Sequence, residues 1–161
     1  PTRNVEIPFI YSREYTIKNG VRQGAILSPI LFCLYMDGVF KILQKEKTGC
    51  IIGNYFAGCF GYADDLLLLC PSRNGLQEML NKVEEYANSH NINFSTNPEP
   101  AKSKTKGIIF GAKYSAEPVK LKLNGNELPW VNKAKYLGNT ITNEINGLQK
   151  DIMEKRAAYI E

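Results

Sequence analysis

The feature that most constrains the fold is a pair of adjacent aspartates, Asp64 and Asp65, set between two apolar runs. Residues 51–62 and 66–70 have the composition of β-strands, and they flank a connection of only three residues. Strands joined by so short a connection pair as an antiparallel hairpin. The sequence therefore predicts a hairpin with two carboxylates at or beside its tip, where the sheet meets solvent.

The paired carboxylates suggest a site for a divalent cation. Two neighbouring negative charges repel each other unless a cation lies between them. Hard oxygen ligands suit Mg²⁺, which keeps its waters and takes one or two carboxylates together with substrate phosphates. Phosphoryl transfer with two metal ions uses such a site. The alternative is an ordinary turn rich in aspartate, because Asp tolerates left-handed backbone and bonds to its own chain.

Two helices are predicted on either side of this hairpin. Ser28 followed by Pro29 indicates a helix start, with Ser28 as the N-cap, and the apolar residues that follow predict a largely buried helix that reaches residues 45–47. Leu76, Met79, Leu80, Val83 and Ala87 form an amphipathic stripe, which predicts a second helix ending near residues 88–91. His90 is expected at the end of that helix, where the helix dipole favours it.

The remaining segments predict short strands, turns and a final helix. Residues 5–10 and 14–17 are expected to pair across residues 11–13, and residues 119–123 with 127–131 across an Asn-Gly turn. Two further strands are expected over residues 107–111 and 136–141, and a last helix over residues 144–161. Helices alternating with hairpins indicate an α+β fold, with a small antiparallel sheet packed against helices.

Composition excludes several classes of protein. The 161 residues are 43% hydrophobic and 22% charged, which is enough apolar material for one packed domain rather than a disordered tail. The four cysteines form no CxxC pair and there is a single histidine, so we expect reduced thiols and no zinc site. No secretory signal opens the chain and no apolar run could span a bilayer, which favours an intracellular protein of the cytoplasm or nucleus.

The positive charge is concentrated in one stretch. The net charge is +4, and residues 101–122 hold six lysines against the single acid Glu117. Such a strip is expected where a polyanion passes over a protein surface. A solvated lysine-rich face explains the charge equally well.

Several motifs of the chain resemble those of the reverse transcriptases. Residues 20–24 (Gly-Val-Arg-Gln-Gly), followed by Leu-Ser-Pro at 27–29 and an apolar helix, are similar to the second polymerase motif of that family. Residues 60–65 (Phe-Gly-Tyr-Ala-Asp-Asp) resemble its catalytic YADD box. Residues 104–110 resemble the next motif, and Tyr-Leu-Gly at 136–138 the motif that grips the primer. The form of these motifs resembles that in non-LTR retrotransposon polymerases, and the resemblance covers residues 20–141.

The resemblance implies roles for the residues around the acidic pair. It implies that Asp64 and Asp65 hold Mg²⁺, or alternatively Mn²⁺, against the triphosphate of a dNTP and the 3′ hydroxyl of the primer. Successive side chains on a strand point to opposite faces, so we expect Asp64 to be the stronger ligand. Tyr62 and Ala63 are expected under the primer terminus.

The same resemblance implies contacts for the other motifs. Gln23 and Gly24 are expected beside the nascent base pair, because glycine lets the backbone approach closely, although a helix-entry turn also explains Gly24. Arg22 is expected on template or phosphate. Lys104 is the candidate that protonates or steadies the leaving pyrophosphate, and its neighbours Lys102 and Lys106 are rivals. One last group is expected to support the primer backbone: Tyr136, Leu137 and Gly138.

The chain also departs from the family pattern. These polymerases use a third aspartate on a strand upstream of the Gln-Gly motif, and the acids before Asp64 are Glu6, Glu14, Asp37 and Glu46, none of them in such a motif. We expect the fingers of the polymerase to be missing from these residues as well. We therefore expect residues 1–161 to be a partial palm that acts with the remainder of a longer polymerase and is inactive alone. The alternatives are a non-catalytic nucleic-acid-binding remnant and a plain interaction domain.

Overall fold

The computed structural model describes most of the chain between the first helix and the final hairpin. The described residues are Gly20, 24–97, Glu99, 102–111 and 120–144, with the pairs 2–3, 6–7, 10–11, 15–16 and 152–153. The predicted strand at 107–111 is reduced to a single parallel bridge between Gly107 and Trp130. Of the predicted last helix over residues 144–161, Glu144, Ile152 and Met153 are described; Glu144 is in a bend, and Ile152 and Met153 are helical.

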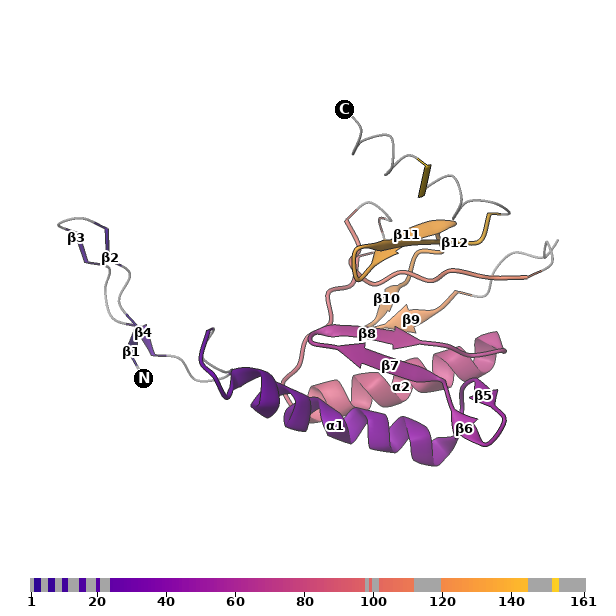
Figure 1. The fold of residues 1–161 in the computed structure, drawn as a ribbon, viewed down its shortest axis with the longest axis horizontal. Coiled ribbons are helices and arrows are strands. Elements are labelled where there is room, and N and C mark those ends of the chain that lie inside the picture. Colours follow the sequence, from indigo (N-terminus) through magenta and orange to yellow (C-terminus); the bar gives the residue numbers. More distant parts are fainter. Residues whose placement is uncertain are drawn as a thin grey trace.

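The architecture is mixed α+β, as the sequence predicts. Figure 1 shows two helices side by side, α1 (Ser28–Glu46) and α2 (Arg73–Ser89), beneath the hairpin β7 (Cys59–Tyr62) and β8 (Asp65–Leu68). Beyond that hairpin lie two further hairpins. Their strands are β9 (Lys122–Leu123), β10 (Asn126–Glu127), β11 (Lys133–Tyr136) and β12 (Asn139–Thr142).

The remaining strands form short antiparallel pairs that correct the prediction. Near the N-terminus β1 (Thr2–Arg3) pairs with β4 (Tyr15–Thr16), and β2 (Glu6–Ile7) pairs with β3 (Ile10–Tyr11), so the chain reverses between Ile7 and Ile10 and not over residues 11–13. The predicted strand 51–62 is three strands. The first two are β5 (Ile51–Ile52) and β6 (Tyr55–Phe56). Gly53, with a φ of +60°, breaks the run because glycine adopts left-handed backbone freely.

Helix α1 begins one residue earlier in the capping pattern than predicted. The backbone of Leu27 is already helical and occupies the N-cap position without a side-chain hydrogen bond, while Pro29 lies in the first turn. The Ser28 amide donates to the Ala25 carbonyl at 3.1 Å, so a backbone turn leads into the helix. Ser28 is therefore the first helical residue and not the cap.

The prediction that α1 is largely buried is wrong for its first half. Met36, Val39 and Leu43 are buried against α2, whereas Ile30 is 57% and Leu34 67% exposed. The reason is positional, because the core that forms with α2 and the β7–β8 hairpin includes only the second half of α1 among its buried residues. Phe32 of the first half packs against this core, but Ile30, Leu31 and Leu34 stay exposed among the described residues.

Helix α2 confirms the predicted stripe. Ser72 caps its N-terminus by accepting a hydrogen bond from the Gly75 amide at 3.1 Å, and Met79, Val83 and Ala87 are buried as expected. Leu80 faces a second core with three leucines of the β9–β10 region, namely Leu121, Leu123 and Leu128. The helix thus holds the two cores together.

An aromatic contact joins the middle of α1 to the C-terminal end of α2. The Tyr86 hydroxyl donates to the Tyr35 carbonyl at 2.5 Å, and the His90 ring stacks on Tyr86 with ring centroids 3.9 Å apart. Gly38 makes this approach feasible, because a Cβ there would lie 2.6 Å from the Tyr86 ring. Burial raises the pKa of the Tyr86 hydroxyl. The His90 amide closes α2 by donating to the carbonyls of Tyr86 and Ala87, which confirms its predicted place at the helix end.

Candidate nucleotidyl-transfer site

The acidic pair lies at the tip of a regular hairpin. Tyr62 at the end of β7 pairs with Asp65 at the start of β8, which leaves Ala63 and Asp64 as a two-residue turn. Ala63 has a φ of +51°, a left-handed conformation that costs an L-residue other than glycine roughly 1–2 kcal/mol. Strain of this kind persists only where the surroundings hold it, and it gathers at functional sites.

The register of the hairpin assigns each side chain to a face. Gly61 and Leu66 are partners on the face toward α1, where a Cβ on Gly61 would lie 2.3 Å from the Phe40 ring. Tyr62 and Asp65 are partners on the opposite face. Sequence reasoning missed Phe60, which shares that outer face and is 47% exposed beside Tyr62 at 66%. The alternation Phe60-Gly61-Tyr62 was the available signal.

Both aspartates are exposed, and their carboxylates are available to a ligand. Neither takes part in the ion pairs found between described residues. Adjacent, exposed carboxylates fit the donor set that Mg²⁺ prefers, which is one or two carboxylates completed by water and phosphate oxygens. In the part of the chain that the structure describes, no group of three or more His, Cys, Asp or Glu side chains could hold a metal ion.

The aspartate nearest before the pair, which lies in helix α1, has another partner. Asp37 lies one turn from Lys41, and their carboxylate oxygen and ammonium nitrogen are 2.5 Å apart. The carboxylate of Asp37 is thus satisfied on the helix surface. Among the described residues, the hairpin tip therefore offers two carboxylates to a metal ion, those of Asp64 and Asp65.

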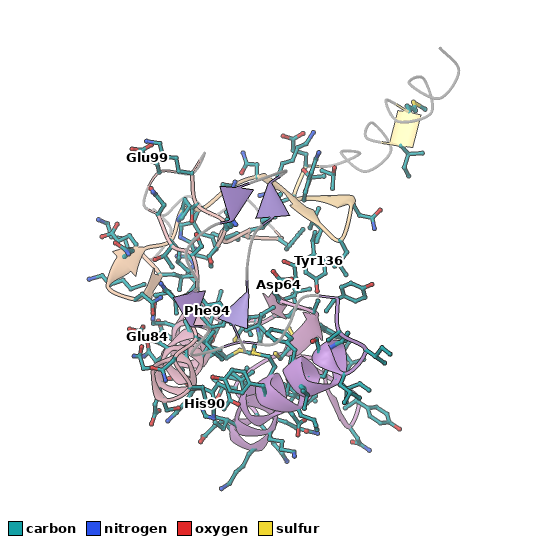
Figure 2. The ribbon with its side chains drawn as sticks, turned by 90° about the vertical axis from the view of Figure 1, so that its left-hand side faces the viewer. Asp64, Glu84, His90, Phe94, Glu99 and Tyr136 are labelled. Carbon is teal, nitrogen blue, oxygen red and sulfur yellow. The ribbon has the colours of Figure 1, made fainter. Side chains whose placement is uncertain are left out.

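The Tyr-Leu-Gly motif forms a turn, not the start of a strand. Tyr136 ends β11 and pairs with Asn139 of β12, so Leu137 and Gly138 are the two turn residues. Their φ values of +49° and +77° are those of a type I′ hairpin turn. Figure 2 shows Tyr136 next to Asp64 in that view, with Glu99 at the opposite side. The prediction of a strand over 136–141 is corrected to Asn139–Thr142.

The lysine strip is less free than its sequence suggests. Lys102 pairs with Glu99 at 2.7 Å and Lys120 with Glu127 at 3.1 Å, so two glutamates from outside the strip neutralise part of it. Lys104 is exposed, and it pairs with neither Asp64 nor Asp65 in the described structure. Lys106 and Lys122 are exposed too. Lys113 lies outside the described residues.

The loop that carries Lys104 is held by a buried serine. Ser103 is 3% exposed, its hydroxyl donates to the Thr105 carbonyl at 2.6 Å, and it accepts from the Asn97 amide at 3.3 Å. Thr105 donates in turn to the Ser95 carbonyl at 2.9 Å. These bonds fix the loop on both sides of Lys104 while its side chain stays in solvent.

The Gln-Gly motif is described only at its end. Gly24 is exposed with a φ of +80°, and it opens the turn that leads into α1. Because glycine adopts left-handed backbone freely, this conformation alone explains why a glycine occupies position 24. Arg22 and Gln23 lie outside the described residues, so their expected contacts stay predictions.

No helix in the described part of the chain combines the length and apolar character that crossing a bilayer requires. The longer of the two, α1, has polar and charged residues in its second half, including Asp37 and Lys41.

Comparison with known proteins gives a family match over most of the chain. The sequence profile of the family described as "Reverse transcriptase (RNA-dependent DNA polymerase)" matches residues 5–141. That stretch contains the acidic turn, the Gln-Gly motif and the Tyr-Leu-Gly turn.

Several curated proteins are similar to parts of the chain. A Pol polyprotein of the retrotransposable element R2DM from Drosophila melanogaster is 41% identical over 75 residues, 47% of this chain and 7% of the polyprotein. An R2 polyprotein from Nasonia vitripennis is 48% identical over 65 residues, 40% of this chain and 6% of its own length. The probable RNA-directed DNA polymerase of the Drosophila melanogaster X-element is 28% identical over 79% of this chain, which corresponds to 13% of that protein. The chain thus spans a small part of these relatives.

Proposed function

The chain belongs to the reverse transcriptase (RNA-dependent DNA polymerase) family, and we propose that it supplies part of the palm of an RNA-directed DNA polymerase encoded by a retrotransposable element. One observation carries the proposal. The β7–β8 hairpin exposes Asp64 in its turn and Asp65 beside it, and neither carboxylate is neutralised by an ion pair with a described residue. The partners would be an RNA template, a DNA primer, a dNTP and the remainder of the polymerase.

Asp64 and Asp65 would hold Mg²⁺, or Mn²⁺ in its place. A divalent ion bound there would supply charge neutralisation to a nucleotidyl transfer and lower the pKa of a coordinated hydroxyl. Asp64 projects from a two-residue turn, whereas Asp65 is fixed by its backbone pairing with Tyr62. We assign the stronger metal contact to Asp64, as the divergence of successive side chains suggests.

The outer face of the hairpin would receive the primer. Phe60 and Tyr62 are exposed aromatic rings on the same face as Asp65, and aromatic rings stack with nucleobases whatever their sequence. Ala63 leaves the turn without bulk beside the acids. Tyr136, Leu137 and Gly138 would support the primer backbone, since a tight I′ turn can approach a strand closely.

The remaining contacts follow the motifs. Arg22, Gln23 and Gly24 would lie by the template and the nascent base pair. Lys104 would reach the leaving pyrophosphate from its loop, because its ammonium group is solvent-exposed and unpaired among the described residues. A lysine acts on phosphate as a point charge, which suits a group that has to follow a leaving anion.

Metal binding by the acidic turn tests the proposal directly. Titrating Mn²⁺ into ¹⁵N-labelled chain should broaden the amide signals of residues 62–66 first, because paramagnetic relaxation falls steeply with distance. Asp64→Asn should weaken binding roughly tenfold or more, since it removes a charged ligand, and Asp65→Asn should weaken it less.

Asp37→Asn is the matched control, because it removes one aspartate charge from the same chain at a position paired with Lys41. It should leave the Mn²⁺ effect at residues 62–66 unchanged. Broadening that is spread evenly over all surface acids, or that survives Asp64→Asn together with Asp65→Asn, would overturn the metal assignment.

A second function, nucleic-acid binding without catalysis, is favoured by the loop of Lys104 and Lys106. Both lysines are exposed and lack the ion pairs that hold Lys102 and Lys120. Changing both to Gln should weaken RNA binding and reduce its salt slope by roughly one for each phosphate that the lysines no longer neutralise. The control changes Lys102 and Lys120 to Gln and should have a smaller effect.

The two functions differ in their dependence on the metal. Binding that is steep in salt but indifferent to Mg²⁺ and to Asp64→Ala favours the non-catalytic function. Binding of primer and template that tightens with Mg²⁺, and loses that gain in Asp64→Ala, favours the polymerase palm. Absence of nucleic-acid affinity at low salt would contradict both.

A further inference from the structure

A polar cavity lies at the C-terminal end of α2. It has a volume of about 440 Å³ and is lined on the helix side by Glu84, Ala87 and Asn88. The chain that follows the helix adds residues 91–93, and the β9–β10 turn adds Asn124. A volume of this size falls in the range of roughly 300–1,000 Å³ that is usual for small-ligand sites. In Figure 2 Glu84 lies at the left edge of the view, apart from Asp64.

The lining is rich in hydrogen-bond acceptors and carries negative charge. Glu84 is half-buried and forms no ion pair with a described residue, whereas its neighbour Glu85 is exposed and pairs with Lys82 at 3.2 Å. No basic residue belongs to the lining within the described structure. A half-buried carboxylate without an ion-pair partner among the described residues favours a cationic ligand.

The end of the helix adds to this field. The carbonyls of Tyr86 and Ala87 accept hydrogen bonds from the chain that closes the helix, but those of Asn88 and Ser89 accept none from described residues. Free carbonyls at a helix C-terminus carry a partial negative charge and attract cations. Glu84 and Asn88 both belong to the lining, so a carboxylate and the C-terminal end of α2 lie at the same cavity.

The amides of the lining are oriented by their own bonds. The Asn124 side-chain nitrogen donates to the Phe94 carbonyl at 3.2 Å and to the Asn93 side-chain oxygen at 3.4 Å. This leaves the Asn124 side-chain oxygen as an acceptor. Several oxygens arranged around one cavity match a planar cation with several donors better than a compact ammonium.

We propose that this cavity binds the guanidinium group of an arginine side chain presented by a polypeptide partner. The group carries a full positive charge and five N–H donors, which answers the charge of Glu84 and the acceptors of Asn124 and the helix end. A nucleic-acid phosphate is disfavoured, because it would meet the Glu84 carboxylate. The site is separate from the acidic turn, so it stands or falls independently of the polymerase proposal.

The test uses the 161-residue chain and a blocked arginine, N-acetyl-arginine amide. Titration followed by ¹H–¹⁵N NMR should shift the side-chain amides of Asn88, Asn91 and Asn124 in a saturable manner, with a Kd on the order of 1 mM. N-acetyl-citrulline amide has almost the same shape without the charge, and it should bind at least roughly tenfold more weakly. The corresponding lysine amide should fall between them.

Variants keep the assignment falsifiable. Glu84→Gln should weaken arginine binding at least roughly tenfold, while the matched control Glu85→Gln should leave it unchanged. Asn88→Asp adds a charge at the rim and should tighten binding several-fold. Thermal unfolding followed by circular dichroism shows whether each variant is folded.

Four outcomes would overturn the inference. The first is equal binding of arginine and citrulline, and the second is equal loss in Glu84→Gln and Glu85→Gln, which would indicate general surface attraction. The third is tighter binding of adenosine monophosphate than of the arginine amide, which would assign the cavity to a nucleotide. Absence of any saturable shift contradicts it as well.

Discussion

Two residues with left-handed backbone stand at the two turns of the candidate site. Ala63 and Leu137 have φ values of +51° and +49°, a region that L-residues other than Asn, Asp and Gly seldom adopt. Each is the first residue of a two-residue turn, followed by Asp64 in one hairpin and by Gly138 in the other. A sequence selected for stability alone would have Gly, Asn or Asp at these two positions, so the alanine and the leucine suggest a functional role.

Leu137→Asn should stabilise the protein. Asparagine tolerates left-handed backbone and is favoured in I′ turns, so the free energy of unfolding should rise by about 0.5–1 kcal/mol in urea denaturation. Gly138→Ala, at a φ of +77°, should lower it. A loss of stability in Leu137→Asn would instead show that packing of the leucine side chain outweighs the backbone strain.

The reactivity of the Cys59 thiol is lowered by its burial. Burial raises the pKa of Cys59 from 9.0 to about 12. At pH 8 roughly one thiol in ten thousand would be the reactive thiolate, so iodoacetamide should modify exposed Cys33 long before Cys59, as mass spectrometry can follow. Modification of Cys59 at the rate of Cys33 in native conditions would contradict the burial.

The same thiol links stability to pH. The unfolded chain loses this proton near the ordinary thiol pKa of 9.0, while the folded protein keeps it up to about 12. The folded state therefore binds more protons across that interval, and its stability should fall as the pH rises through it. Urea midpoints between pH 8 and 10 should decline more steeply in this chain than in Cys59→Ser.

At the scale of elements, local features were predictable and tertiary ones were not. Helix α2 was predictable because its apolar stripe lies within one segment of the sequence. The extent to which α1 is buried was not predictable, since it depends on which part of α1 packs against α2 and the β7–β8 hairpin. The ion pairs of Lys102 and Lys120 likewise depend on Glu99 and Glu127, which lie outside the charged window in sequence.

In the candidate site, too, the local features were predictable from the sequence and the tertiary ones were not. The hairpin and its acidic tip were predictable from residues 58–69, because the two aspartates interrupt apolar strand-forming runs. The turn at Leu137 was not, because leucine carries no left-handed signal and only the following glycine does. The shared outer face of Phe60, Tyr62 and Asp65 required the register that the pairing supplies.

Gly58 joins the hairpin to the segment that precedes it. A Cβ on Gly58 would lie 2.6 Å from the Phe56 ring and 2.9 Å from the Cα of Gly49, and backbone cannot move aside as a flexible side chain can. Gly58→Ala should therefore lower the free energy of unfolding by about 1–3 kcal/mol in urea denaturation. Glu78→Ala, on α2, is the control and should change it little. Equal effects would show that this approach does not limit the fold.

At the scale of the whole molecule, the chain presents an exposed pair of carboxylates on a folded platform. Two carboxylates are exposed at the hairpin tip, while Asp37 is held by Lys41 on α1. Most apolar side chains in the first half of α1, such as Ile30 and Leu34, are exposed among the described residues. Both observations are consistent with a palm segment that works together with other parts of a longer polymerase.

The 161-residue chain on its own should therefore fail to extend a primer. Nucleotidyl transfer requires the metal ions, the primer hydroxyl and the triphosphate to be held within a fraction of an ångström, and a poorly coordinated ion loses that geometry. Incubation with a primed RNA template, dNTPs and Mg²⁺ should give no extension above background, with Asp64→Ala indistinguishable from the parent. Efficient extension that Asp64→Ala abolishes would show that two carboxylates of this turn suffice, and the dependence on further polymerase segments would then be wrong.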